Sequence, residues 1–265
     1  MQALKPRNRT GGALRMPRTV AALMLREMAT SYGRSPGGYL WAIAEPAAAL
    51  ALLSVIFSTA FAAPSVGVNF PLFYATGYLP FMLFNDVGNK MATSIRFSKQ
   101  LLAYPVVTFL DALVARFLLN LLTQATVMII VFTAILMIFD TRAVLHMPSI
   151  LASVAMAAGL GLGVGTLNCY LMTAFPAWER SWQIATRPLF LISGIFFIYD
   201  DIPSPVREIL WYNPLMHVVG MMRRGFYGFY HANYVSPLYV TCIALATLAL
   251  GLLLLRRHQR ALLQD

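Results

Sequence analysis

The sequence predicts an all-α protein that crosses a membrane several times, and three observations support this prediction. Hydrophobic residues make up 59% of the 265 residues, whereas charged residues make up only 11%. A soluble domain carries about 25% charged residues, so this chain has too few to cover an aqueous surface. The apolar residues fall in long runs, and we expect six of these runs to cross the bilayer as helices.

The six expected spans are bounded by glycine, proline and polar residues, which commonly end helices. They cover residues 39–62, 70–92, 109–139, 149–174, 184–199 and 237–255. The fifth is short for a complete crossing. The fourth contains Gly159, Gly161, Gly163 and Gly165, whose small-xxx-small spacing favours close helix packing over phosphate binding.

The basic residues indicate how the chain is oriented. Of the 20 lysine and arginine residues, four lie on the predicted outer side and the other 16 lie at inner ends; the four are Arg142, Arg207, Arg223 and Arg224. This asymmetry follows the positive-inside rule and predicts cytoplasmic tails at 1–16 and 256–265. The net charge of +10 is therefore attributed to topology, not to nucleic-acid binding.

The spacing of apolar and polar residues over 17–33 predicts an amphipathic helix that lies in the membrane interface. Its apolar face is expected to hold Val20, Ala21, Met24, Leu25, Met28 and Tyr32, and its polar face Arg26, Glu27 and Thr30. Gly33 and the prolines and glycines at 36–38 end it. The helix is either a plain anchor or an anchor that also contacts a cytoplasmic partner.

The stretch 193–230 is broken by Asp200, Asp201, Pro203 and Pro205 into segments that are too short to cross a bilayer. These segments are nevertheless rich in Trp, Tyr, Phe and Met. Backbone at membrane depth must satisfy its own polar groups, so we expect a re-entrant helical hairpin at 202–230, between the fifth and sixth spans.

No catalytic constellation stands out in the sequence. The four histidines are scattered, the two cysteines lie in apolar runs, and no pattern of metal ligands is present. The phosphate-binding pattern G-x-x-x-x-G-K-[ST] is also missing, so we do not expect this chain to bind ATP by that route. If this chain takes part in energised transport, we expect the energy to enter from another subunit through the cytoplasmic connections.

Three blocks resemble the membrane subunit of ABC-2-type exporters. They are REMATSYGRSPGGYLWAIAEP at 26–46, LLAYP at 101–105, and the stretch from SGIFF to WYNPLMHVVGMMRRGFY at 193–227. Within that family the blocks are similar to the capsular polysaccharide-export permeases of the KpsM type, and the resemblance covers nearly the whole chain.

The resemblance implies a homodimer of this chain with two copies of a separate ATPase subunit, which would bind ATP and Mg²⁺. It implies a multi-pass protein of a bacterial inner membrane, working with a periplasmic co-polymerase and an outer-membrane channel. The substrate would be a long acidic polysaccharide on a phospholipid with a sugar-acid linker. The resemblance implies a transporter permease and not an enzyme, and no cofactor is expected on this chain.

The resemblance also maps the family's elements onto this sequence. The gate helix maps to 17–33, the coupling helix to about 96–107, a second ATPase contact to about 176–182, and the re-entrant helices to 202–230. The residues expected to contact the ATPase are Arg96, Lys99, Leu101, Leu102, Tyr104, Pro105, Trp178, Glu179 and Arg180.

The export pathway is expected between the two protomers, lined by the first, second and fifth spans. Aromatic faces suit a polysaccharide because they contact sugar rings without requiring one orientation. The candidates are Tyr39, Trp41, Glu45, Phe57, Phe61, Phe73, Tyr74, Phe196, Phe197 and Tyr199. The alternatives are that the aromatics only mark the membrane interfaces, and that Glu45 forms a structural pair with a basic neighbour.

The outer exit is expected at Arg207, Trp211, Tyr212, Arg223 and Arg224. The sequence offers no obvious partner for Arg223 and Arg224, which we expect to attract acidic sugars, lipid phosphate or a protein partner. The alternative is that both snorkel to lipid headgroups.

Three other functions stay open at this point. One is an exporter of O-antigen or teichoic acid on a polyprenyl carrier, and a second is an ABC-2 exporter of drugs or lipids. The third is a membrane enzyme acting on lipid-linked sugars, which the missing acid, base and metal clusters disfavour.

Overall fold

The computed structural model describes residues 15–31, 37–102 and 108–264. These ranges contain helices and connecting loops and no strand, which confirms the all-α prediction. Residues 1–14 of the predicted N-terminal tail lie outside the described residues. So do Tyr32 and Gly33 of the predicted amphipathic helix, and the predicted coupling residues Tyr104 and Pro105.

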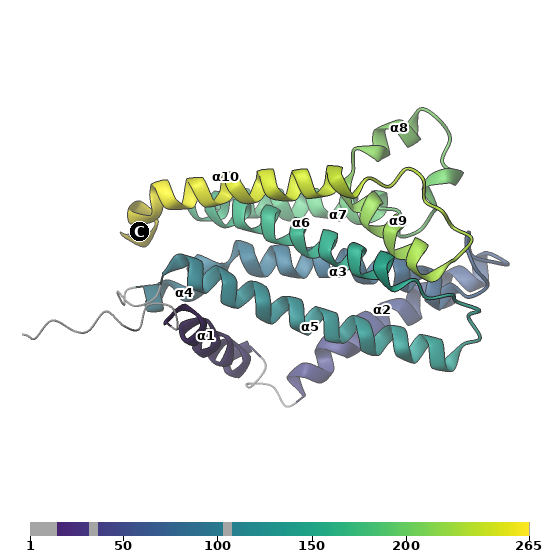
Figure 1. The fold of residues 1–265 in the computed structure, drawn as a ribbon, viewed down its shortest axis with the longest axis horizontal. Helices are drawn as coiled ribbons and strands as arrows, with labels where there is room; N and C mark the ends of the chain where they lie inside the picture. Colours follow the sequence, from purple (N-terminus) through teal and green to yellow (C-terminus); the bar gives the residue numbers. More distant parts are fainter. Residues whose placement is uncertain (1–14, 32–36, 103–107, 265) are drawn as a thin grey trace, which may run out of the picture.

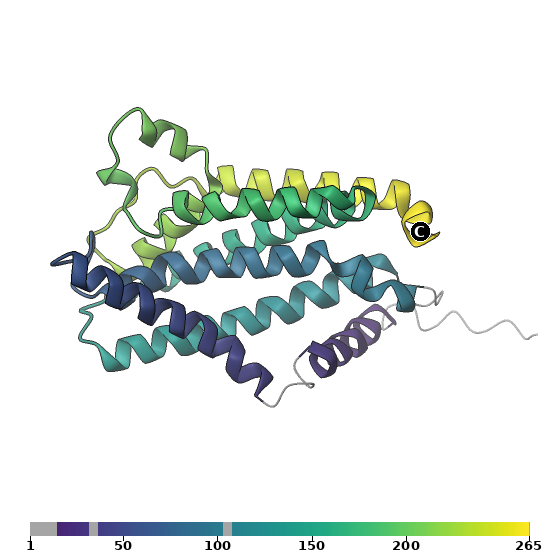
Figure 2. The same ribbon diagram turned by 180° about the vertical axis from the view of Figure 1, so that it is seen from behind.

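Long helices run side by side along the molecule (Figure 1). The central ones are α3 (Phe70–Ala92), α5 (Phe109–Ile138), α6 (Met147–Ala174) and α10 (Pro237–Gln264). Two further helices lie against this bundle, as Figure 2 shows: α2 (Gly38–Ala60), which contacts α3 and α5, and α7 (Pro176–Ile192), which contacts α6.

Short helices close the two ends of the bundle (Figure 1). The end where the chain terminates carries α1 (Arg15–Ser31) and α4 (Ser94–Leu102), and we call it the α4 end. The opposite end carries the 3-10 turn η1 (Tyr199–Asp201), α8 (Val206–Trp211) and α9 (Pro214–Phe226), and we call it the α8 end.

Four helices in the described ranges are long and apolar enough to cross a membrane. They are Leu40–Ala60, Phe109–Ile138, Met147–Ala174 and Pro237–His258. The helix α3 has the predicted bounds, but Asn85, Asp86, Asn89 and Lys90 make its second half polar. The helix α7 has only 17 residues.

The centre of the bundle is held by small residues of α6, as the glycine spacing predicted. Gly161 and Gly165 face α3, where an added Cβ would lie 3.0 Å from the Phe84 carbonyl oxygen and 2.6 Å from that of Gly88. Gly163 faces the Ala244 carbonyl of α10, and there is no room for a side chain. The packing interpretation is confirmed, because the backbones approach too closely for larger residues.

The bounds expected around the fifth span are wrong. Residues 176–183 are helical in α7 instead of connecting two spans, because Pro176 suits the first turn of a helix. The helix ends at Ile192, and Gly194 then turns the chain with a φ of 79°. Residues 193–198 are therefore not part of a helix. The helix α10 continues beyond the predicted end at 255.

Candidate functional site

At the α4 end, the two segments predicted to contact an ATPase are joined to each other. The Arg96 guanidinium of α4 lies 2.6 Å from the Glu179 carboxylate of α7 and also donates to the Met172 carbonyl of α6. Both side chains of the ion pair are more than a third exposed. The structure therefore connects segments that are 83 residues apart in the sequence.

The other predicted coupling residues differ in what they contact. The Trp178 indole donates to the Asn168 side chain of α6 at 2.9 Å, and Arg180 is exposed. The backbone of Lys99, Leu101 and Leu102 is helical in α4, whereas their side chains lie outside the description.

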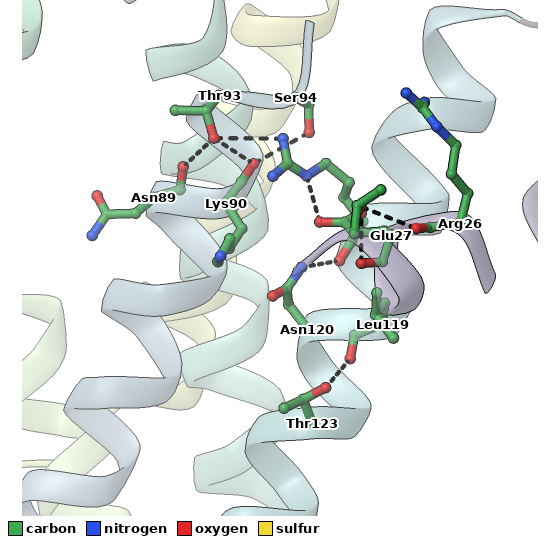
Figure 3. Close-up of polar contacts among 11 residues, drawn as sticks. Arg26, Glu27, Asn89, Lys90, Thr93, Ser94, Leu119, Asn120 and Thr123 are labelled. Atoms are coloured by element: carbon green, nitrogen blue, oxygen red, sulfur yellow. Dashed lines mark hydrogen bonds and ion pairs between the residues drawn. The ribbon is translucent and has the colours of Figure 1, made fainter. Parts of the chain in front are cut away.

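A buried ion pair connects α1 to α5. Glu27, labelled in Figure 3, accepts a hydrogen bond from Nε of Arg116 at 2.9 Å. The side chains of Glu27 and Arg116 are only 5% and 6% exposed. The placement of Glu27 on the solvent-facing side of the amphipathic helix is therefore wrong. The helix turns Val20 and Glu27 toward α5 and leaves Leu25 and Met28 exposed, because Arg116 needs a counter-charge inside the bundle.

The helix α4 contributes an aromatic ring to the same pair. The Arg116 guanidinium lies 4.3 Å from the centre of the Phe97 ring, and one of its nitrogens lies 3.5 Å from the hydroxyl of Thr93, where α3 ends. We call Glu27, Phe97 and Arg116 the inner arginine cluster. It ties α1, α4 and α5 together, and breaking such a buried pair leaves an uncompensated charge.

At the α8 end, a second arginine is buried, contrary to prediction. Arg223 is only 1% exposed, and it donates to the carbonyls of Phe197 at 2.6 Å and Ile195 at 3.0 Å. Its guanidinium lies 4.3 Å from the centre of the Phe73 ring. The expectation that Arg223 faces outward without a partner is therefore wrong. The non-helical carbonyls of 193–198 need donors, and Arg223 supplies them.

The remaining predicted exit residues are closer to expectation. Arg207, Arg224 and Tyr212 are exposed, and Trp211 is half-buried. The Trp211 indole donates to the Tyr234 carbonyl at 3.2 Å, so its orientation is set by the loop before α10.

Several residues that organise this end were missed. Asn213 caps α9 by accepting from the Leu215 N–H, and its amide donates to the Ile192 carbonyl at 3.0 Å. An Asn-Pro pair before an apolar segment is the signal that could have identified this cap. The Tyr230 hydroxyl lies 3.5 Å from the Tyr234 hydroxyl and donates to it.

The predicted pathway aromatics are only partly brought together. The Phe57 ring lies within 6.0 Å, centre to centre, of the rings of Phe61, Tyr74 and Phe196. Phe61 is exposed, whereas Phe73, Tyr74 and Tyr199 are buried within one copy of the chain. Phe197 is half-buried. A single copy of the chain therefore exposes few of the ten residues predicted to line the pathway.

The first helix of the predicted pathway carries two exposed candidates. Trp41 is 67% exposed, and the Glu45 side chain is also exposed. Within the described ranges Glu45 makes no ion pair, so the structural pair given as its alternative role is not found there. The side chain of Tyr39 lies outside the description.

The fold is that of a helical membrane protein, and each end of its bundle holds a buried arginine. The sequence matches the ABC-2 type transporter family over residues 18–227, and the chain belongs to this family.

Three relatives make the comparison specific. The chain is 32% identical to the polysialic acid transport protein KpsM of Escherichia coli over 245 residues, 92% of this chain and 95% of the relative. It is 27% identical to the capsule polysaccharide export inner-membrane protein CtrC of Neisseria meningitidis serogroup A over 244 residues, 92% of each chain. It is 25% identical to the O-antigen export system permease protein RfbA of Klebsiella pneumoniae over 238 residues, 86% of this chain and 87% of the relative. The predicted resemblance is confirmed, and these relatives are named for transport or export.

Proposed function

We propose that this chain is the membrane subunit of an ATP-driven exporter of lipid-linked capsular polysaccharide in a bacterial inner membrane. The observation that carries the proposal is the 32% identity, over 92% of the chain, to a protein named for polysialic acid transport. The O-antigen permease is less similar in identity and in coverage. Export of O-antigen on a polyprenyl carrier is therefore the alternative.

We further propose six spans with both termini in the cytoplasm. The helix α3 serves as the second span, because it packs against α2, α5, α6 and α9, and its Asp86 carboxylate accepts a hydrogen bond from the Gln124 amide of α5. The helix α7 is about 26 Å long at 1.5 Å per residue, slightly short of a bilayer core of about 30 Å. Residues 193–198 complete this fifth crossing, and 202–230 form the re-entrant region.

Energy enters at the α4 end in this proposal. Two partner subunits bind ATP and Mg²⁺, and their closure displaces α4. The Arg96–Glu179 ion pair transmits this displacement to α7, and the inner arginine cluster transmits it to α1. The result is rigid-body switching that is biased by a ligand bound to another subunit.

A homodimer completes the pathway. Apolar side chains of α2 and α7 are exposed, among them Leu52, Ile56 and Ile184, and this supports a surface that a second copy of the chain covers. The polysaccharide then passes between the copies and meets a periplasmic co-polymerase and an outer-membrane channel at the α8 end.

Deletion of the gene tests the function. We expect polysaccharide to accumulate inside the cell on a phospholipid terminus, and plasmid-borne wild-type protein to restore surface capsule. Trapped glycan on a polyprenyl carrier would support the O-antigen alternative. An unchanged cell surface would contradict polysaccharide export altogether.

A further inference from the structure

An apolar groove runs between α2 and α5. It has a volume of about 540 Å³, and its walls include Leu50 and Ala51 of α2 and Ile130 and Ala134 of α5. The two serine hydroxyls of the wall donate to carbonyls of their own helix, Ser54 to Leu50 and Ser58 to Val55. The groove therefore suits a hydrocarbon chain.

A second hollow adjoins this groove at the α8 end. It has a volume of about 370 Å³, and it shares Val68 with the groove. Arg142 is the charged residue among its lining residues, and within the described ranges Arg142 makes no ion pair. The hydroxyl of Tyr227, also in the lining, is buried and makes no hydrogen bond of ordinary length and angle among the described residues.

The loop that carries Arg142 is held in place on both sides. The Asn69 amide donates to the Asp140 carbonyl, and the His146 N–H donates to the Gly225 carbonyl at 2.8 Å. Arg142 itself has a φ of 48°, a left-handed conformation that an arginine keeps only when its surroundings impose it. The backbone position of Arg142 is therefore set by the fold, and its exposed side chain is accessible from outside the hollow.

We propose that the groove and the adjoining hollow bind one anionic membrane phospholipid. An acyl chain lies between α2 and α5, and the headgroup phosphate lies at Arg142. Both helices are long and apolar enough to span a membrane, so the groove lies at the depth of acyl chains. A guanidinium pairs well with phosphate oxygens, and the charge of the hollow complements an anion. This inference needs only a membrane-embedded chain and not a particular exported substrate.

Native mass spectrometry of the purified full-length chain tests the proposal, with phosphatidylglycerol and phosphatidylcholine as the added probes. We expect one retained lipid per chain, with phosphatidylglycerol preferred. Ala51→Phe should abolish retention by filling the groove, whereas the control Leu122→Phe, exposed on α5 but outside the lining, should not. Arg142→Gln should weaken phosphatidylglycerol retention about tenfold, since a charged hydrogen bond is lost, whereas the control Arg224→Gln should not.

Two results would overturn the proposal. One is equal retention by each variant and its control, and the other is equal retention of the two lipids by the wild type. A disulfide-linked dimer of Ala134→Cys, made in a chain without Cys169 and Cys242, would show instead that a second copy covers the groove. If a variant fails to fold, a crosslinking experiment on the wild-type protein tests the site instead. A phosphatidylglycerol with a photoreactive acyl chain should crosslink to α2 and α5, and crosslinks confined to other helices would contradict the site.

Discussion

Two arginines are buried at opposite ends of this protein, and their guanidinium groups are bound in different ways. Arg116 at the α4 end and Arg223 at the α8 end each lie 4.3 Å from the centre of a phenylalanine ring. Arg116 pairs with a carboxylate on another helix, whereas Arg223 binds two backbone carbonyls of a non-helical segment.

The Glu27–Arg116 ion pair joins two helices that can move relative to each other, whereas the contacts of Arg223 hold a segment in a fixed position. Glu27 lies on α1, which contacts the bundle chiefly through α5, so the ion pair can transmit a displacement between helices. Arg223 instead completes the hydrogen bonding of 193–198 and holds that segment to α9. We therefore expect loss of Arg223 to impair folding, and loss of the inner arginine cluster to impair coupling as well.

Arg223→Met should produce the largest effect. It leaves the carbonyls of Ile195, which is buried, and Phe197, which is half-buried, without this donor. At about 1–3 kcal/mol for each carbonyl, the free energy of unfolding should fall by about 2–6 kcal/mol. Thermal unfolding of the detergent-purified protein measures the change. The control Arg224→Met alters an exposed neighbour and should change stability by less than about 0.5 kcal/mol. Equal losses would show that the carbonyl contacts of Arg223 do not stabilise the fold.

Glu27→Ala should be almost as damaging. It leaves Arg116 buried without a counter-charge, and removal of one partner from such a pair costs about 3–5 kcal/mol. The matched control is Ala21→Ser, on an exposed position of the same helix. Unfolding midpoints of the two variants provide the comparison, and an unchanged midpoint for Glu27→Ala would contradict the buried pair.

The double variant Glu27→Met and Arg116→Met should separate stability from coupling. Replacing both charges with apolar side chains is often neutral for stability, so most of the loss in Glu27→Ala should be recovered. Export should nevertheless stay impaired while the partner's ATP hydrolysis continues. Measuring capsule at the surface and ATP turnover in membranes tests this, and normal export would show that the pair has only a structural role.

The exposed Arg96–Glu179 pair should give the smallest effect on stability. Both residues are more than a third exposed, and such pairs contribute about 0–1 kcal/mol. Glu179→Gln should therefore leave the unfolding midpoint nearly unchanged but lower export. The charge exchange Arg96→Glu with Glu179→Arg should restore part of that export. A failure of the exchange alongside normal export by Glu179→Gln would remove this pair from the coupling route.

Much of the helical framework could be predicted from the sequence. The bounds of α3 and the positions of α2, α5 and α6 follow from long apolar runs, because helix formation in a membrane depends on local composition. The segment 176–199 was placed wrongly, because a polar first turn resembles a connecting loop until the capping residues are seen. Among the site residues, Arg96 and Glu179 were identified separately, and the contact between them was not.

The sequence by itself determined that this chain forms membrane helices, that α6 packs closely through glycine, and that α1 is amphipathic. These properties depend on residue type and local spacing. Only the tertiary structure decided that Arg223 is buried while Arg224 is exposed, and that Glu27 turns inward. Adjacent residues on a helix point about 100° apart, and the helix that packs nearby decides which one is enclosed. That neighbour comes from a distant part of the chain, so no local pattern specifies it.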